Sequence, residues 1–373
     1  MKLPKDHRPY TDKYFLRTNE ILNAERLNPE ISMKVFARGS GKVAGLNEAI
    51  EVLEEFSDLA NTGEVWVTQD EVYQNKDPLM IIKGPAQSFA ELETMYLGVL
   101  SAAITSEAGI VEPNMGEVKE KFERLVEIYQ DMPITYFGAR HYHWCLDEQI
   151  AKAALEGGAI QTSTDIGSGN IGLKGVGTTP HLLTIILADK YGIEDSTLKT
   201  AQLFDKHMDS EIPRVTLVDT FNRELTDSLA VAGYFGNRRN LFRIDTCGEN
   251  IGEGGNLYQG KKSKDPSYQV GTGVTVELAR NLRNNLIENG YGPSTDTFLS
   301  SSFGNEEKAK TFVKANQEFK AETGYDLFTG VGIGEVSEAR FCTADIYEVD
   351  GKPFSKTGRE VSEIDYTKLR RVL

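Results

Sequence analysis

The sequence contains little cysteine, tryptophan, histidine or excess positive charge. Its 373 residues include 3 cysteines, 2 tryptophans and 5 histidines. Cys145, Cys247 and Cys342 lie far apart without a CxxC pair, which excludes a zinc knuckle and suits a reducing compartment. The 56 acidic residues outnumber the 41 basic ones, giving a net charge of -15 with no basic tract. This balance argues against a nucleic-acid partner.

Long apolar runs are also missing. No segment approaches the length that crosses a bilayer, and the opening MKLPKDHRPYTDKYF lacks the apolar stretch of a secretory leader. We therefore expect a cytoplasmic protein with neither a membrane nor a nucleic-acid partner. A chain that is 39% hydrophobic and 26% charged has the composition of a globular protein with one or two cores.

Residues 1–130 mix helical and strand patterns. Residues 46–60 carry apolar side chains at helical spacing, and EVWVTQDEVYQNKDPLMIIKGP alternates as strands around a polar NKDP turn. SFAELETMYLGVLSAAI predicts a buried helix, and EVKEKFERLVEIYQD predicts an amphipathic one. These patterns predict an N-terminal α/β domain.

From about residue 133 the pattern changes to short apolar segments that alternate with helical stretches. The segments are PITYFGARH, GAIQTSTD, RVTLVDTF, NLFRIDT, DTFLSSS and YDLFTGVG. This βα alternation predicts a parallel sheet over residues 131–339, either open or closed into a barrel. The final FCTADIYEVDGKPFSKTGRE predicts two strands around a VDGK turn, so we expect residues 340–373 to join the N-terminal domain.

Polar and charged residues gather where the predicted parallel strands end, and chemistry collects at such carboxyl ends. Asp219 and Asp245 each follow an apolar strand and precede a threonine. They either hold ribose hydroxyls and a magnesium diphosphate or cap the following loop. Arg140 either grips a carboxylate beside Phe137 or lies on the surface. The remaining strand-end candidates are Thr162, Ser163, Arg243, Ser300, Ser301, Gly330 and Gly332.

His181 follows the glycine-rich stretch GVGTTP. Thr178 and Thr179 predict a helix cap and Pro180 suits a first turn, so His181 falls at a helix N-terminus. That position attracts anions and disfavours an imidazolium. Either a neutral nucleophile meets a phosphate here, or the histidine is a capping or core residue. His141 and His143 show the i, i+2 spacing of metal ligands, but no third ligand lies nearby in the sequence.

Taken in order, several motifs resemble the nicotinate phosphoribosyltransferase family over nearly the whole chain. They are TDKYFLRT, GPAQSFAELETMYLGVLS, FGARH, GAIQTS, GTTPH, VDTF, FRID, FTGVGIGE and GKPFSKTGR. The resemblance implies an irregular α/β barrel with an N-terminal α/β domain completed by C-terminal strands. It implies a homodimer, or a higher oligomer, with shared active sites.

The activity implied by the resemblance joins nicotinate to 5-phosphoribosyl-1-diphosphate in NAD biosynthesis, with nicotinate mononucleotide and diphosphate as products. ATP hydrolysis is coupled to this transfer through a phosphohistidine, and Mg²⁺ travels with the diphosphate. His181 matches the phosphorylated histidine, while Asp219 and Asp245 would hold the ribose and the magnesium diphosphate. The implied phosphate-binding residues are Arg38, Ser300, Ser301, Gly330, Gly332, Gly334, Lys352 and Lys356.

The pyridine ring would stack on Phe137, with Tyr14 of the partner subunit on its other face. Arg140 and Arg243 would meet its carboxylate or the adjacent phosphate, beside Thr162. Nicotinamide-using relatives place an aspartate where this chain has Ser163, a hydroxyl that can donate to a carboxylate. Repulsion between an aspartate and the carboxylate of nicotinate is on the order of 4 kcal/mol at about 4 Å and an effective dielectric constant near 20. An inward-facing Asp165 would instead favour the amide.

Three alternatives remain open. The enzyme uses nicotinamide, or it uses quinolinate, which needs more basic residues around a dicarboxylate and does not need His181. The third alternative is a non-catalytic relative that binds a nucleotide or a sugar phosphate.

Overall fold

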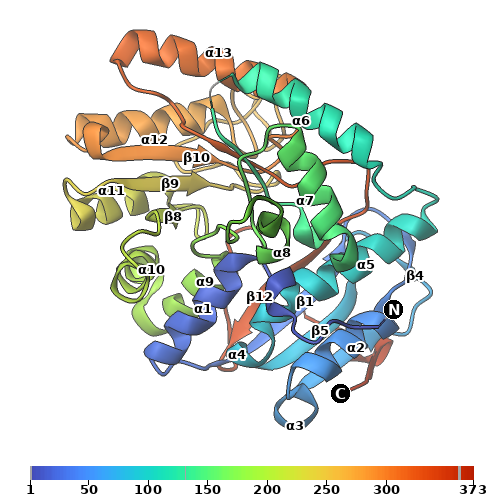
Figure 1. Cartoon of the computed structure of the whole chain (residues 1–373). Helices are drawn as coiled ribbons and strands as arrows, with labels where there is room; N and C mark the ends of the chain where they lie inside the picture. The colour runs from blue at the N-terminus through green and yellow to red at the C-terminus, as the bar shows by residue number, and fades with distance from the viewer. Residues whose placement is uncertain (1, 131, 360–362) are drawn as a thin grey trace.

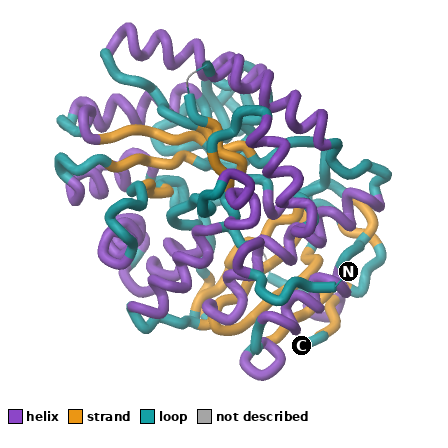
Figure 2. The backbone as a smooth tube through the Cα atoms, in the orientation of Figure 1, coloured by secondary structure: helices purple, strands orange, loops and turns teal. Residues whose placement is uncertain are grey.

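A computed structural model describes residues 2–130, 132–359 and 363–373. The described chain forms two six-stranded sheets with helices packed against both (Figure 1). The strands of the two sheets form separate groups, and most helices lie on their outer faces (Figure 2). The predicted α/β class is confirmed. Within the described ranges, no helix is long and apolar enough to cross a membrane.

The first sheet is antiparallel and combines strands from both ends of the chain. Its order is β13 (Lys352–Pro353), β12 (Cys342–Val349), β1 (Glu30–Ala37), β5 (Pro78–Pro85), β3 (Glu64–Thr68) and β14 (Leu369–Arg371). The β12–β13 hairpin turns at Asp350 and Gly351, whose φ angles of 47° and 74° suit the tight turn read from VDGK. The C-terminal strands therefore complete the N-terminal sheet, as predicted.

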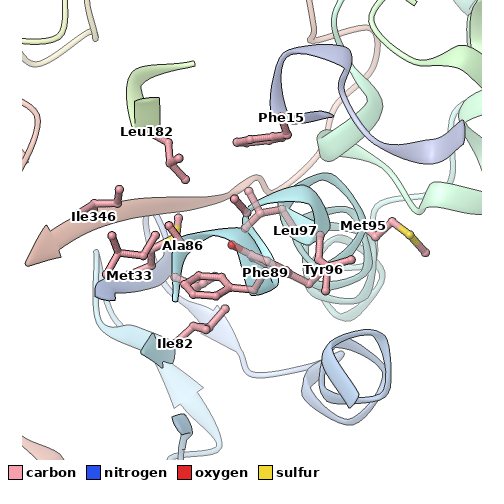
Figure 3. Packing of buried hydrophobic residues seen from close by; sticks show 14 of the residues in the cluster. Phe15, Met33, Ile82, Ala86, Phe89, Met95, Tyr96, Leu97, Leu182 and Ile346 are labelled. Carbon is pink, nitrogen blue, oxygen red and sulfur yellow. The ribbon is translucent and has the colours of Figure 1, made fainter. Parts of the chain in front are cut away.

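Helices of the N-terminal half pack on this sheet and enclose its core. They are α1 (Lys13–Ala24), α2 (Leu46–Phe56), α3 (Leu59–Thr62), α4 (Ala86–Phe89) and α5 (Glu93–Glu107), with the small β2 (Gly41–Lys42) and β4 (Val72–Tyr73) pair beside them. Phe15, Ile82, Leu97 and Ile346 meet in this core (Figure 3). The predicted buried helix is α5, and its length is almost wholly shielded from solvent.

Helix α9 (His181–Tyr191) and helix α10 (Ile193–His207) belong to the later part of the sequence but pack into the same core. Leu182, on the first turn of α9, lies above Met33 of β1 and Ile346 of β12 (Figure 3). One core thus crosses the expected boundary near residue 131. This packing fixes the start of α9 against the first sheet.

The second sheet is parallel throughout. Its order is β7 (Gln161–Thr162), β6 (Ile134–Tyr136), β11 (Val331–Ile333), β10 (Thr295–Leu299), β9 (Asn240–Ile244) and β8 (Val215–Leu217). The sheet curls, but no pairing joins β7 to β8 within the described ranges, so the barrel is incomplete. This is the irregular α/β barrel that was expected.

Helices surround the curled sheet in a continuous series of neighbours. The series runs α10, α11 (Glu224–Phe235), α12 (Val276–Glu288), α13 (Glu306–Thr323), α6 (Met115–Tyr129), α7 (Asp147–Glu156) and α8 (Asp165–Ser168). A second apolar core fills the space between them and the sheet. Polar side chains gather at the carboxyl ends of β9 and β10, among them Arg243, Asp245 and Ser300.

Candidate active site

A cavity of about 580 Å³ lies between the carboxyl ends of β6, β9, β10 and β11 and the strands β1 and β12 of the other sheet. Most of the residues predicted for the site line it. They are Tyr14, Arg38, Phe137, Arg140, His181, Arg243, Asp245, Ser300, Ser301, Gly332, Gly334 and Lys356. Residues that are far apart in the sequence are therefore brought to one place by the two sheets.

Five predicted residues do not line the cavity. Thr162 is buried and shares a 2.9 Å hydrogen bond with the hydroxyl of Ser168. Lys352 is exposed and pairs with Asp189 at 3.1 Å. The other three that lie outside the cavity lining are Asp219, Ser163 and Gly330.

His181 is the first residue of α9, so its side chain projects from a helix N-terminus. The expected cap is wrong, because Pro180 occupies the N-cap position and makes no side-chain cap bond. Thr178 instead donates its hydroxyl to the carbonyl of Val215 on the edge strand β8, while the amide of Val176 donates to the carbonyl of Thr162 on the opposite edge strand β7. The helix start is held by packing rather than by a threonine cap.

Asp219 and Lys356 both contact Nε2 of His181. The Asp219 carboxylate lies 3.1 Å from Nε2 of His181, and the ammonium of Lys356 lies 2.7 Å from the same nitrogen and also donates to Asp219. Asp219 is fully buried, whereas 26% of the His181 side chain is exposed to the cavity. Nε2 can accept from Lys356 or donate to Asp219, so the tautomer of the ring decides which bond forms.

Burial and the charges of this cluster together favour the neutral form of the histidine. Burial and the adjacent Lys356 lower the pKa of His181, although Asp219 opposes the shift. Burial alone would raise the pKa of Asp219, but Lys356 and His181 outweigh it and hold that pKa below its ordinary value. The result is a buried ion pair next to an uncharged imidazole, which is the state a nucleophilic nitrogen requires.

A second cluster stands at the ends of β9 and β10. The guanidinium of Arg243 donates to the hydroxyl of Ser300 at 2.9 Å and to Asp245 at 3.2 Å, and Ser300 donates to Asp245 at 2.7 Å. Burial acts to raise the pKa of Asp245, but Arg243 overcomes it and the net shift is downward. Asp245 therefore keeps a negative charge in the cavity.

The aromatic part of the cavity is formed by Phe137 and Tyr14. The guanidinium of Arg243 lies 5.3 Å from the centre of the Phe137 ring, and Arg140, three residues further along the FGARH turn, also lines the cavity. Tyr14 lies in the wall of its own chain's cavity, and its expected role across a subunit interface stays a prediction. Only 8% of Tyr14 is exposed and its ring lines the cavity of its own chain, because α1 packs beside α10.

Comparisons with known proteins identify relatives of the N-terminal part and of the whole fold. Residues 12–104 match the family described as quinolinate phosphoribosyl transferase, N-terminal domain. A putative nicotinate phosphoribosyltransferase from Saccharomyces cerevisiae superposes with a TM-score of 0.66 at 15% identity, covering 97% of this chain and 96% of that one.

Two further solved structures are similar. The nicotinate phosphoribosyltransferase from Porphyromonas gingivalis has a TM-score of 0.62 at 16% identity over 93% of this chain and 92% of its own. The one from Vibrio cholerae has a TM-score of 0.61 at 13% identity over 93% and 87%. The chain has the nicotinate phosphoribosyltransferase fold.

Within the nicotinate phosphoribosyltransferase fold, the segment after β7 carries Ser163 and Asp165. Asp165 does not turn inward: it pairs with Lys13 at 2.8 Å and accepts a hydrogen bond from the amide of Gly175, also at 2.8 Å. Ser163 is buried, and its hydroxyl has no hydrogen-bond partner within the described structure. The amide-favouring alternative therefore receives no support from Asp165.

The two histidines considered as metal ligands are directed to different places. His143 lies 3.0 Å from a carboxylate oxygen of Glu48. His141 lines the cavity, with its ring centre 4.2 Å from that of Phe341. His141 ends a short 3-10 helix (Ala139–His141) and His143 is the N-cap of the next one (Trp144–Leu146), so neither lies on a strand and the i, i+2 spacing of strand ligands does not apply. Among the described residues no group of three or more acidic, histidine or cysteine side chains could hold a metal ion.

Sequence reasoning missed Glu93 and Arg359, which both line the cavity. Glu93 is the first residue of α5 and lies 3.3 Å from Arg140. Its signal was a lone acid at the start of an apolar helix. Arg359 was visible only as part of the basic GKPFSKTGR segment. Its Nη1 lies 3.5 Å from Asp345, and its Nε and Nη1 have no hydrogen-bond partner in the described structure.

Proposed function

We propose that the protein is a nicotinate phosphoribosyltransferase of NAD biosynthesis. It transfers the phosphoribosyl group of 5-phosphoribosyl-1-diphosphate to nicotinate and releases nicotinate mononucleotide and diphosphate. One observation carries this proposal: His181, which contacts the Asp219–Lys356 pair, shares one cavity with the strand-end residues Asp245 and Arg243. The fold supports the same assignment.

The transfer itself requires positioning more than acid–base chemistry. The pyridine nitrogen attacks C1 of the ribose as the bond to diphosphate breaks, and positive charge develops on the sugar ring. Phe137 and Tyr14 offer aromatic faces to the pyridine, and Arg140 offers a guanidinium to its carboxylate. Asp245 lies on the side of the cavity where the ribose would sit, with its charge maintained by Arg243.

Coupling to ATP would pass through His181. The lone pair of one imidazole nitrogen attacks the γ-phosphorus, and the bond from that phosphorus to the bridging oxygen of ADP breaks. The lowered pKa of His181 supports this step, because a protonated ring has no lone pair to offer. Lys356, 2.7 Å from Nε2 of the ring, provides a positive charge next to the phosphorylated histidine.

Magnesium would arrive with the diphosphate. Asp245 lines the cavity and suits a hard cation, whereas Asp219 is enclosed behind His181 and neutralised by Lys356. When bound, the ion neutralises charge on the departing diphosphate. Asp219 is thus a positioning residue for His181 in this proposal. We also propose a cytoplasmic homodimer, or a higher oligomer, in which Tyr14 serves the cavity of its own chain.

Quinolinate is the second candidate substrate, and the match of residues 12–104 to the quinolinate phosphoribosyl transferase domain favours it. Basic side chains are numerous in the cavity, namely Arg38, Arg140, Arg243, Lys356 and Arg359. These side chains would suit a dicarboxylate, but an enzyme that uses quinolinate does not need a histidine at the position of His181. We therefore rank nicotinate first.

The test is product formation by purified protein supplied with 5-phosphoribosyl-1-diphosphate, Mg²⁺ and each pyridine, with and without ATP. Nicotinate mononucleotide should appear from nicotinate, and faster with ATP. Binding of a nucleotide or sugar phosphate by calorimetry, without product from any pyridine, would favour the non-catalytic alternative.

A further inference from the structure

Glu93 is a buried acid in a cavity that is proposed to receive anions. Only 7% of its side chain is exposed, it lines the cavity, and its Oε1 accepts a hydrogen bond from Arg140 at 3.3 Å. Arg140 is the residue proposed to meet the pyridine carboxylate. Glu93 therefore occupies a guanidinium that must release it, or share it with the substrate, when an anionic substrate binds.

The charges around this pair do not favour another anion. Glu93 is faced by Arg140 from the 3-10 helix that follows β6, by Asp12 and Tyr14 at the start of α1, by Tyr96 on α5 and by Asp345 on β12. Asp245 also acts on Arg140 from the end of β9. Arg243 pairs with Asp245 and Arg359 pairs with Asp345, so Glu93 and Asp12 are the carboxylates left to act on Arg140. A further like-charge pair at about 4 Å costs on the order of 4 kcal/mol at an effective dielectric constant of about 20.

Among these carboxylates, Glu93 is the one that can be protonated near neutral pH. Burial raises the pKa of Glu93 to about 8, with Arg140 opposing the shift and Asp12 adding to it. Asp245 behaves in the opposite way, since Arg243 holds its pKa low. Proton uptake on substrate binding therefore falls on Glu93 and leaves Asp245 ionised.

We propose that Glu93 is a positioning and specificity-determining residue: its ionised form pairs with Arg140 in the free cavity, and that form takes up one proton when a pyridine carboxylate binds the guanidinium. This inference rests on the proposed function. The proton comes from solvent and binds a carboxylate oxygen of Glu93, and no other bond is made or broken. In its neutral form Glu93 can donate a hydrogen bond, whereas in its ionised form it repels the substrate carboxylate.

The proposal separates nicotinate from nicotinamide by pH. Nicotinate should bind the form of the cavity with Glu93 protonated, so its Kd should rise as pH increases past the pKa of about 8. Between about pH 7 and about pH 9 the Kd should rise about tenfold. Nicotinamide carries no charge, so its Kd should stay flat or fall, since ionised Glu93 accepts an amide N–H.

The experiment is calorimetry of nicotinate and of nicotinamide with the full chain, in two buffers of different ionisation enthalpy. For nicotinate, uptake of close to one proton is expected at about pH 9 and of almost none at about pH 7. Glu93→Gln should abolish both the uptake and the tenfold change in Kd. Glu335→Gln is the matched control, because it removes an acid from the exposed rim of the same cavity and should leave the pH profile unchanged in shape.

Two results would overturn the role of Glu93. One is nicotinate binding to the unaltered chain at about pH 9 without proton uptake, a measurement that does not depend on the variant folding. The other is an equal loss of affinity at both pH values in Glu93→Gln, which marks a structural role. Nicotinate binding with proton uptake but without nucleotide product would contradict the proposed function and would still support the role of Glu93. Absence of nicotinate binding would contradict both.

Discussion

Asp219 lies 3.1 Å from Nε2 of His181, yet of the two only His181 reaches the cavity. The carboxylate is fully buried and is paired with the largely buried Lys356. Asp219 thus orients the imidazole and fixes its charge environment without meeting a ligand itself. The strand-end aspartate of β8 and that of β9 therefore have different positions, although their sequence contexts, VDTF and RIDT, look alike.

His181→Ala should remove phosphorylation while leaving the fold intact. The side chain is partly exposed at the start of α9, so little packing is lost. We expect no protein-bound phosphate after incubation with γ-labelled ATP, and transfer to nicotinate that no longer responds to ATP. His207→Ala is the control, because His207 pairs with Glu25 outside the cavity. Full ATP stimulation in His181→Ala would contradict the assignment.

Asp219→Asn should destabilise the protein in a pH-dependent way. It leaves the ammonium of Lys356 buried without its anion, at a cost of about 3–5 kcal/mol at neutral pH. The pKa of Asp219 is lower in the folded chain, so its contribution is present above the unfolded pKa of about 4 and is lost as pH falls through the folded value.

Urea unfolding at several pH values measures this difference. The gap in unfolding free energy between the unaltered chain and Asp219→Asn should narrow as pH falls below about 4. Asp189→Asn is the control: it removes the partner of the exposed Lys352 and should cost less than about 1 kcal/mol. A pH-independent gap would show that the ion pair is not the cause.

Gly332→Ala should disturb the pyridine site. A Cβ at this position would lie 2.4 Å from Cδ2 and Cε2 of Phe137, so the ring must move. We expect a nicotinate Kd about tenfold higher, equivalent to about 1.4 kcal/mol. Gly169→Ala, with nothing within 4 Å of its Cβ and outside the cavity, should bind normally. Unchanged binding in Gly332→Ala would show that Phe137 does not contact the ring.

The sequence predicted the parts of this molecule that depend on local pattern. The βα alternation, the C-terminal hairpin and the position of His181 in a first helical turn are all read from short segments, and the structure confirms them. The ordered series of family motifs along the chain also predicted the fold. These features follow from spacing and turn chemistry within about ten residues.

Depth within the fold was not predictable in the same way. The sequence alone suggests that Asp219 lines the cavity, but in the structure it is buried and paired with Lys356 from the C-terminal part of the chain. The sequence likewise suggests that Glu93 is an acid on a helix surface, but in the structure it contacts Arg140. The position of Tyr14 could not be predicted without knowing that α1 packs beside α10. Each of these depends on contacts between segments that are far apart in sequence. The roles of Ser163 and Gly330 stay predictions.

The central claim is that this cavity attaches a phosphoribosyl group to nicotinate. Its most direct test is a competition assay with nicotinate, nicotinamide and quinolinate at equal concentration, each carrying a different isotope label, with 5-phosphoribosyl-1-diphosphate, Mg²⁺ and ATP. The ratio of labelled products gives the ratio of kcat/KM values. We predict that almost all nucleotide product carries the nicotinate label at about pH 7, where Glu93 is protonated. Product labelled mainly from nicotinamide or quinolinate would contradict the account.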